Sequence, residues 1–171
     1  FPNISRYLPA EPPAEGEPIV QWETPIPPDE AYSRLALMSE FEAASVYRLG
    51  ESYLGRDIWA MDLMSPVEAT HWSQAKVSTT KPTVVYSARQ HANEVSSTSH
   101  VLKFAERLLT DDELRPALRK VNVVIHPITN PDGAQLAYDL HQITPDHMLH
   151  AGYLGSLGVD VTAAQWEDDP V

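Results

Sequence analysis

The hydrophobic positions of this chain change period along its length, and each period predicts a different element. From Pro28 to Phe41 apolar residues recur at near-helical spacing, with two acidic residues in the first turn, where a helix dipole favours negative charge. Residues 45–50 and 58–64 each have the pattern of a strand, and a turn at 55–57 joins them. We therefore expect a helix followed by a β-hairpin.

Two short apolar runs follow a polar, turn-rich segment at 65–81. Residues 83–88 and 121–126 are typical of strands buried on both faces of a sheet. Between them, apolar residues from 95 to 109 follow a helical period. Strand, helix and strand in this order indicate a right-handed crossover in an α/β sheet.

Proline dominates the first part of the chain, where residues 1–28 contain eight of the 15 prolines. Proline has a fixed φ and no backbone N–H, so this arm can be neither a helix nor a central strand. We expect residues 1–28 to form an extended segment laid over a surface, a linker or a partly ordered tail.

Composition narrows the classes of function. The 171 residues include 12 Lys and Arg against 24 Asp and Glu, a net charge of -12, which disfavours nucleic acid and anionic membranes as partners. There is no cysteine, which excludes disulfides, thiolate zinc sites and cysteine nucleophiles. The apolar runs are far shorter than the roughly 20 residues of a membrane-spanning helix.

The candidate chemistry lies where the strand at 83–88 gives way to the following helix. His91 and Glu94 are three residues apart across this turn, so an imidazole nitrogen and a carboxylate oxygen can converge on one metal ion. Open α/β sheets place ligands at the carboxyl ends of strands, and two His with one Glu form a known catalytic zinc set. Alone the H-x-x-E pattern is weak, because a surface His and Glu at a helix start are more common.

Three segments, taken in order, make this interpretation more specific. They are 55–58 (Gly-Arg-Asp-Ile), 84–94, which contains the H-x-x-E pattern, and 129–133 (Thr-Asn-Pro-Asp-Gly). In order and spacing they resemble the zinc carboxypeptidases, a peptidase family in which a Gly-Arg turn precedes a strand ending in H-x-x-E and a later strand ends in N-P-D-G. The resemblance covers roughly residues 30 to 160.

The resemblance implies a zinc-dependent hydrolase of peptide or amide bonds with an α/β/α fold, in which helices flank a mixed sheet. His91 and Glu94 match the first two ligands of one Zn²⁺. The family's third ligand, a His, and its general-base Glu come from the later half of the domain and match nothing before Val171. We expect residues 29–171 to be the N-terminal part of a catalytic domain. The main partner is then expected to be the remainder of that domain, supplied by a later part of the chain or by a second chain.

The groups that would hold a substrate are less complete. Asn93, Asn130 and His141 are the candidate substrate-binding residues. The family grips a C-terminal carboxylate with Arg, partly from a D-x-N-R segment, and Thr162 and Ala163 stand where its Asn and Arg would be. Zinc-dependent hydrolysis is therefore better supported than ordinary C-terminal exopeptidase specificity.

Several alternatives stay open at this point. His126 follows a buried strand and is either a third ligand or, more commonly, a core histidine. His141, His147 and His150 suggest a polar loop that lines the cleft. The chain is either part of an enzyme or a non-catalytic metal- or peptide-binding relative. Its first residue is Phe1 and not Met, which indicates a processed protein or a piece of a longer product. Either is compatible with a secreted or periplasmic protein.

Overall fold

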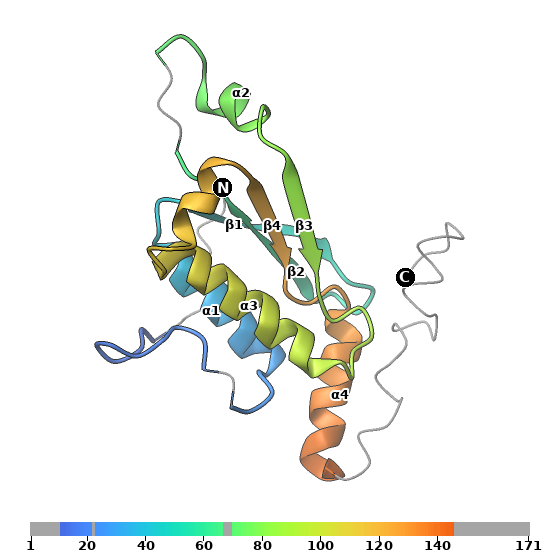
Figure 1. Ribbon diagram of the computed structural model, residues 1–171. Coiled ribbons are helices and arrows are strands. Elements are labelled where there is room, and N and C mark those ends of the chain that lie inside the picture. Colours follow the sequence, from blue (N-terminus) through green and yellow to red (C-terminus); the bar gives the residue numbers. More distant parts are fainter. Residues whose placement is uncertain (1–10, 22, 67–69, 146–171) are drawn as a thin grey trace.

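The computed structural model describes residues 11–21, 23–66 and 70–145, and Figure 1 shows a four-stranded sheet with helices packed against it. The strands are β1 (Ala44–Glu51), β2 (Asp57–Leu63), β3 (Thr83–Ser87) and β4 (Asn122–His126). The helices are α1 (Pro28–Met38), α2 (Gln74–Ser78), α3 (Val95–Thr110), the 3₁₀ helix η2 (Arg115–Arg119) and α4 (Pro131–Ile143). No helix in these ranges is long and apolar enough to cross a membrane.

The sheet is mixed, as the resemblance implies. Its strand order is β1-β2-β4-β3, with antiparallel pairing of β1 to β2 and of β2 to β4, and parallel pairing of β3 to β4. The parallel pair is connected through α3, so the predicted strand–helix–strand unit is confirmed. The predicted hairpin is β1 and β2, whose turn places Gly55 at φ 78°, a conformation that suits glycine.

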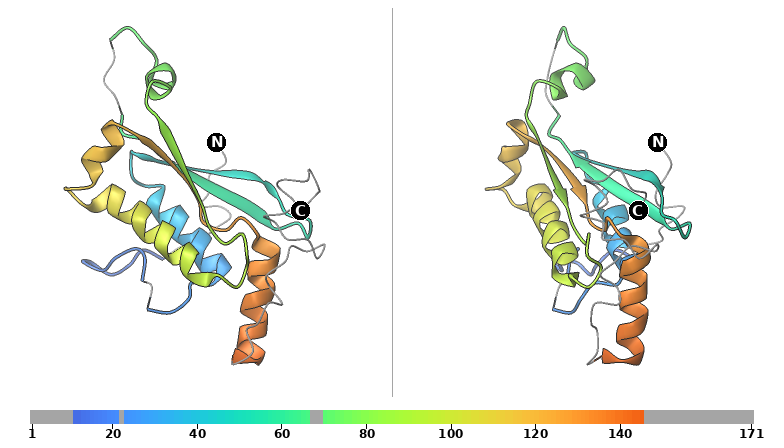
Figure 2. Two further views of the ribbon diagram at one scale, coloured as in Figure 1. Left: turned by 45° about the vertical axis from the view of Figure 1, so that its right-hand side comes forward. Right: turned by 90° about the vertical axis from the view of Figure 1, so that its right-hand side faces the viewer.

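One face of the sheet carries the core, and α1 and α3 lie together against it (Figures 1 and 2). Alternate residues of β2 face these helices, which is why Trp59, Met61 and Leu63 are fully buried. The apolar stripes of the two helices supply Leu35 and Leu102 to the same core. The α/β fold class predicted from the sequence is therefore confirmed.

The prediction that residues 83–88 form a strand buried on both faces is wrong for β3. All five of its residues are exposed, and Val85 keeps 55% of its surface. The reason is position: in the described part of the chain β3 pairs only with β4 and is an edge of the sheet. A run of apolar residues predicts a strand but does not say whether the strand is central.

The segment at 65–81, predicted to be turn-rich, contains one short helix. Ser73 caps α2 by accepting a hydrogen bond from the backbone N–H of Lys76 at 3.3 Å. Five residues are too few for a strong periodic pattern, so the polar composition hid this helix.

Part of the proline-rich arm packs against the body. Val20 and Ile26 are buried in the core, and the carboxylate of Glu106 on α3 accepts hydrogen bonds from the backbone N–H groups of Ile19 (2.8 Å) and Val20 (3.2 Å). Lys103 lies 2.7 Å from the same carboxylate. Ile19 and Val20 are therefore attached to α3, while residues 1–10 and 22 lie outside the described ranges.

Candidate metal centre

The two parallel strands end side by side, and the loops that follow them stay paired. The Ala88 N–H donates to the carbonyl of His126 at 2.8 Å, and the Thr129 N–H donates to the carbonyl of Ala88 at 2.9 Å. The Asn130 N–H then donates to the carbonyl of Arg89 at 3.2 Å. The start of the loop that carries His91 is thus fixed to the loop that opens α4.

The side chains of His91 and Glu94 converge. Their atoms Nδ1 and Oε1 are 3.2 Å apart, and the Glu94 N–H closes the turn on the carbonyl of His91 at 3.1 Å. Zinc bonds of about 2.0–2.2 Å at a tetrahedral angle separate two such donors by about 3.3–3.5 Å. The Glu94 side chain is 57% exposed and that of His91 is 17% exposed, so the pair is open on one side.

This geometry fits two ligands of one zinc ion. The same separation also suits a hydrogen bond between imidazole and carboxylate, so the pair alone does not distinguish the two states. Within residues 11–21, 23–66 and 70–145, no group of three or more His, Asp or Glu side chains could hold a metal ion. His126, the third-ligand alternative within these ranges, does not form such a group with His91 and Glu94 in this structure.

The N-P-D-G motif forms hydrogen bonds and close contacts with the loop that carries His91. Asn130 caps α4 by accepting a hydrogen bond from the Gly133 N–H at 2.9 Å, and its amide Nδ2 donates to the carbonyl of Gln90 at 3.3 Å. A Cβ on Gly133 would lie 2.8 Å from Cβ of Ala92, which is closer than real Cβ contacts. Glycine at this position lets the helix approach the metal-motif loop.

Asp132 connects the N-P-D-G motif to the Gly-Arg turn between β1 and β2. Its buried carboxylate accepts hydrogen bonds from Oγ of Ser52 (2.7 Å) and the N–H of Leu54 (3.1 Å), and pairs with Nη1 of Arg56 at 3.3 Å. These partners form the turn between β1 and β2. The three sequence segments that carry the family resemblance therefore meet at one end of the sheet, held by hydrogen bonds and one ion pair.

Sequence reasoning missed Arg89, two residues before His91. Its side chain is buried, and Nε donates to the carbonyl of Ala92 at 2.7 Å. Its backbone has φ 57°, a left-handed conformation in which no other non-glycine residue of the described ranges is found. Burial lowers the pKa of the guanidinium to about 10. No pattern rule singles out an arginine here, because its role depends on the path of the loop.

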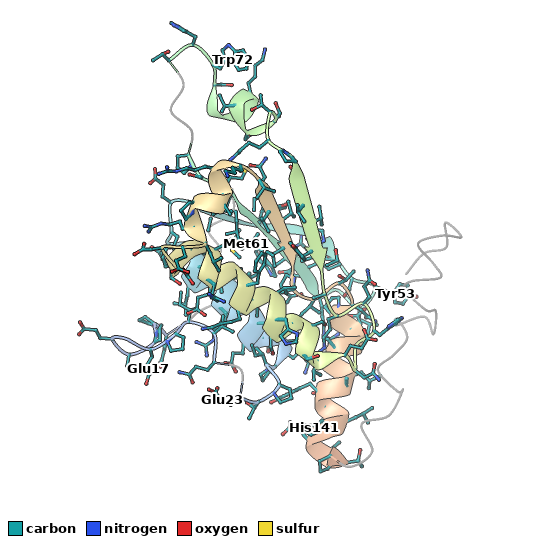
Figure 3. All side chains as sticks on the ribbon, viewed as in Figure 1. Glu17, Glu23, Tyr53, Met61, Trp72 and His141 are labelled. Carbon is teal, nitrogen blue, oxygen red and sulfur yellow. The ribbon has the colours of Figure 1, made fainter. Side chains whose placement is uncertain are left out.

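The predicted substrate-binding residues do not all gather at this site. Asn93 lies between the two candidate ligands, and its buried Oδ1 has no hydrogen-bond partner among the described residues. Asn130 is buried, with its amide bonded as above. His141 is ten residues along α4 from Pro131, about 15 Å at the rise of a helix, and Figure 3 shows it far from Tyr53 of the hairpin turn.

The remaining histidine candidates are placed differently. Nδ1 of His126 is 3.2 Å from Oγ of Ser87, at the ends of the two parallel strands. Burial lowers the pKa of His126, and the negative charge of Asp62 opposes this in part. His147 and His150 lie outside the described residues, as do Thr162 and Ala163. The roles predicted for all these residues stay predictions.

Solved structures of metallocarboxypeptidases share this fold. A metallo-carboxypeptidase from Burkholderia cenocepacia is 23% identical, with a TM-score of 0.58 over 79% of this chain and 31% of its own. A metallo-carboxypeptidase from Pseudomonas aeruginosa, in complex with (2-guanidinoethylmercapto)succinic acid, is 22% identical, with a TM-score of 0.51 over 80% of this chain and 31% of its own.

A third similar structure is bovine thrombin-activatable fibrinolysis inhibitor in complex with tick carboxypeptidase inhibitor. It is 19% identical, with a TM-score of 0.55 over 74% of this chain and 36% of its own. The chain thus spans about a third of the length of these three structures. No curated protein sequence matches the chain.

The family can be assigned from the sequence itself. The profile of the family described as zinc carboxypeptidase matches residues 31–152, which is more than two thirds of the chain and contains all three motif segments. With the carboxypeptidase fold around the paired loops, this match shows that the chain belongs to the zinc carboxypeptidase family.

Proposed function

We propose that this chain is the N-terminal part of a zinc-dependent metallocarboxypeptidase-like hydrolase of peptide or amide bonds, in which Nδ1 of His91 and the carboxylate of Glu94 hold one Zn²⁺. The observation that carries the proposal is their 3.2 Å separation on a loop fixed by the N-P-D-G motif. Family membership supports it, because it supplies the reason for a metal between these two donors.

The chain's own residues prepare the site for the metal. Metal binding needs the neutral imidazole of His91 and the ionised carboxylate of Glu94. When bound, zinc supplies Lewis acidity toward a carbonyl group and lowers the pKa of water. The third ligand and the general base are proposed to come from the later part of the domain, because the family pattern has both residues there.

A substrate would enter on the open side of the His91–Glu94 pair. Asn93 is a proposed contact of the substrate, because it lies in the loop between the two ligands and its Oδ1 is an acceptor with no partner among the described residues. This oxygen is buried, so the side chain would have to rotate to reach a substrate. It would accept a hydrogen bond from an N–H group of a peptide or amide. Direct roles for Asn130 and His141 remain further proposals.

The edge of the sheet supports a second part of the proposal, that the remainder of the domain is the partner of this chain. Val84, Val85 and Tyr86 on β3 are exposed large hydrophobic side chains at an edge strand. Exposed apolar edge strands are pairing sites for further strands. The chain's coverage of about a third of its structural neighbours agrees with this.

Zinc content and hydrolysis in the full-length protein test the proposal. We expect about one zinc per molecule by mass spectrometry of the purified protein, and loss of both zinc and peptide hydrolysis in His91→Ala and Glu94→Gln. His71→Ala and Glu113→Gln are matched controls, because both side chains are exposed and lie outside the motif. Zinc retained in His91→Ala would contradict the metal site, and zinc without hydrolysis would indicate a non-catalytic, binding relative.

A further inference from the structure

Arg89 combines two features that are unfavourable for an arginine. Its φ of 57° is in the left-handed region, where a side chain's Cβ is crowded by the backbone. Its guanidinium is also inside the protein, since the residue is only 2% exposed. Such a combination persists only where the surrounding contacts hold it, and it is most often found near functional sites.

The contacts of Arg89 link it to three elements. Its backbone N–H donates to Oγ of Ser97 in α3 at 3.0 Å, and its carbonyl accepts from the N–H of Asn130 at 3.2 Å. Its Nε donates to the carbonyl of Ala92 at 2.7 Å. The Ala92 carbonyl belongs to the peptide unit that joins Ala92 to Asn93, so this bond holds the middle of the turn between the two candidate ligands.

The hydrogen bond, rather than the charge, is what the side chain contributes. Arg89 takes part in none of the ion pairs between described residues, and its Nη1 has no hydrogen-bond partner among them. On the other side of the turn, Ala92 faces Gly133 of α4. The turn is therefore held between the planar guanidinium of Arg89 and the first turn of α4.

We propose that Arg89 is a positioning residue for the metal site: its Nε–H fixes the Ala92 peptide so that His91 Nδ1 and Glu94 Oε1 face one another. This inference rests on the proposed function, because it assigns the control of ligand geometry at that same site. Groups that orient metal ligands without touching the metal commonly change metal affinity 10- to 100-fold when they are removed.

Two substitutions separate the backbone from the side chain. Arg89→Gly removes the hydrogen bond but accepts the left-handed φ without strain. Arg89→Lys keeps a positive donor but loses the rigid, planar guanidinium. Arg107→Ala is the matched control, because Arg107 is an exposed arginine of α3 that pairs with Asp111.

The experiment measures zinc affinity of the full-length protein by competition with a chelator, together with the melting temperature of the metal-free and zinc-loaded forms. We expect Arg89→Gly to weaken zinc binding about 10-fold or more, and to reduce the rise in melting temperature that zinc causes. Arg89→Lys should recover part of the affinity, and Arg107→Ala should match the wild type. A purely structural role would lower both melting temperatures equally and leave the zinc affinity unchanged.

Zinc affinity of Arg89→Gly within twofold of the wild type would overturn the inference while leaving the metal site intact. If the wild type and His91→Ala both fail to bind zinc, the proposed function itself is wrong. If Arg89→Gly does not fold, Arg89→Lys decides, and wild-type zinc affinity in that variant would refute the role of the planar Nε–H donor.

Discussion

Gly133 is the position at which one methyl group tests the packing of the site most directly. It lies in the first turn of α4, and an added Cβ would be 2.7 Å from Nδ2 of Asn130 and 2.8 Å from Cβ of Ala92. The Asn130 amide is held by the carbonyl of Gln90, and the Ala92 methyl is attached directly to the backbone. Gly133→Ala therefore forces the loop and the helix apart.

Two effects of opposite sign compete in this variant. Alanine is favoured over glycine inside a helix by about 1 kcal/mol. Overpacking by a methyl group costs about 1–3 kcal/mol, and loss of the Asn130 hydrogen bonds adds about 1 kcal/mol. The unfavourable contacts should outweigh the helix preference, with a net destabilisation of about 2 kcal/mol. This corresponds to a fall of about 4–8 °C in melting temperature for a domain of about 150–250 residues and to a smaller fall for a larger domain.

Thermal unfolding of the metal-free full-length protein is the assay, and zinc affinity is the second readout. Gly50→Ala is the control, because a Cβ at Gly50 would meet no atom within 4 Å. We expect Gly133→Ala to lower both stability and zinc affinity, since the displaced loop carries His91 and Glu94. A Gly133→Ala protein as stable as the wild type, or more so, would refute the close packing of α4 on this loop.

Three other substitutions test separate contacts. Glu106→Gln should destabilise the protein by about 1–3 kcal/mol in urea unfolding, because one amide cannot accept from both arm N–H groups and Lys103; an unchanged midpoint would mean that the arm is not attached through α3. Asp132→Asn should lower the free energy of unfolding by a similar amount, because the ion pair with Arg56 is lost and an acceptor oxygen is replaced by a donor NH₂ group. Asp112→Asn is the control at an exposed ion pair. For His126, burial lowers the folded pKa, so the unfolded state binds the proton more readily. Stability should therefore fall as pH drops below about 6.5, the ordinary histidine value, and level off below the folded pKa. His126→Gln should remove this part of the pH dependence, and an identical pH profile would contradict the shift.

Local patterns predicted most of the elements but not their environments. The period of apolar residues was enough for α1, the β1–β2 hairpin and the β3–α3–β4 unit, because each pattern lies within a single element. It did not predict the exposure of β3, since the same apolar run suits a central strand and an edge strand. It also missed the short helix α2 and the attachment of Ile19 and Val20, which depends on a carboxylate more than 80 residues away.

The sequence by itself determined the family, through the order of three motifs, and the two candidate zinc ligands, whose spacing of three residues across a turn lets them converge. Only the tertiary structure decided how those motifs are held. The bonds from Asp132 to the hairpin turn join residues 76 to 80 positions apart, and the bond from Asn130 to Gln90 joins residues 40 apart. Periodicity and spacing report neighbours along the chain, whereas the roles of Arg89, Asp132 and Gly133 arise from backbone paths that meet only after folding.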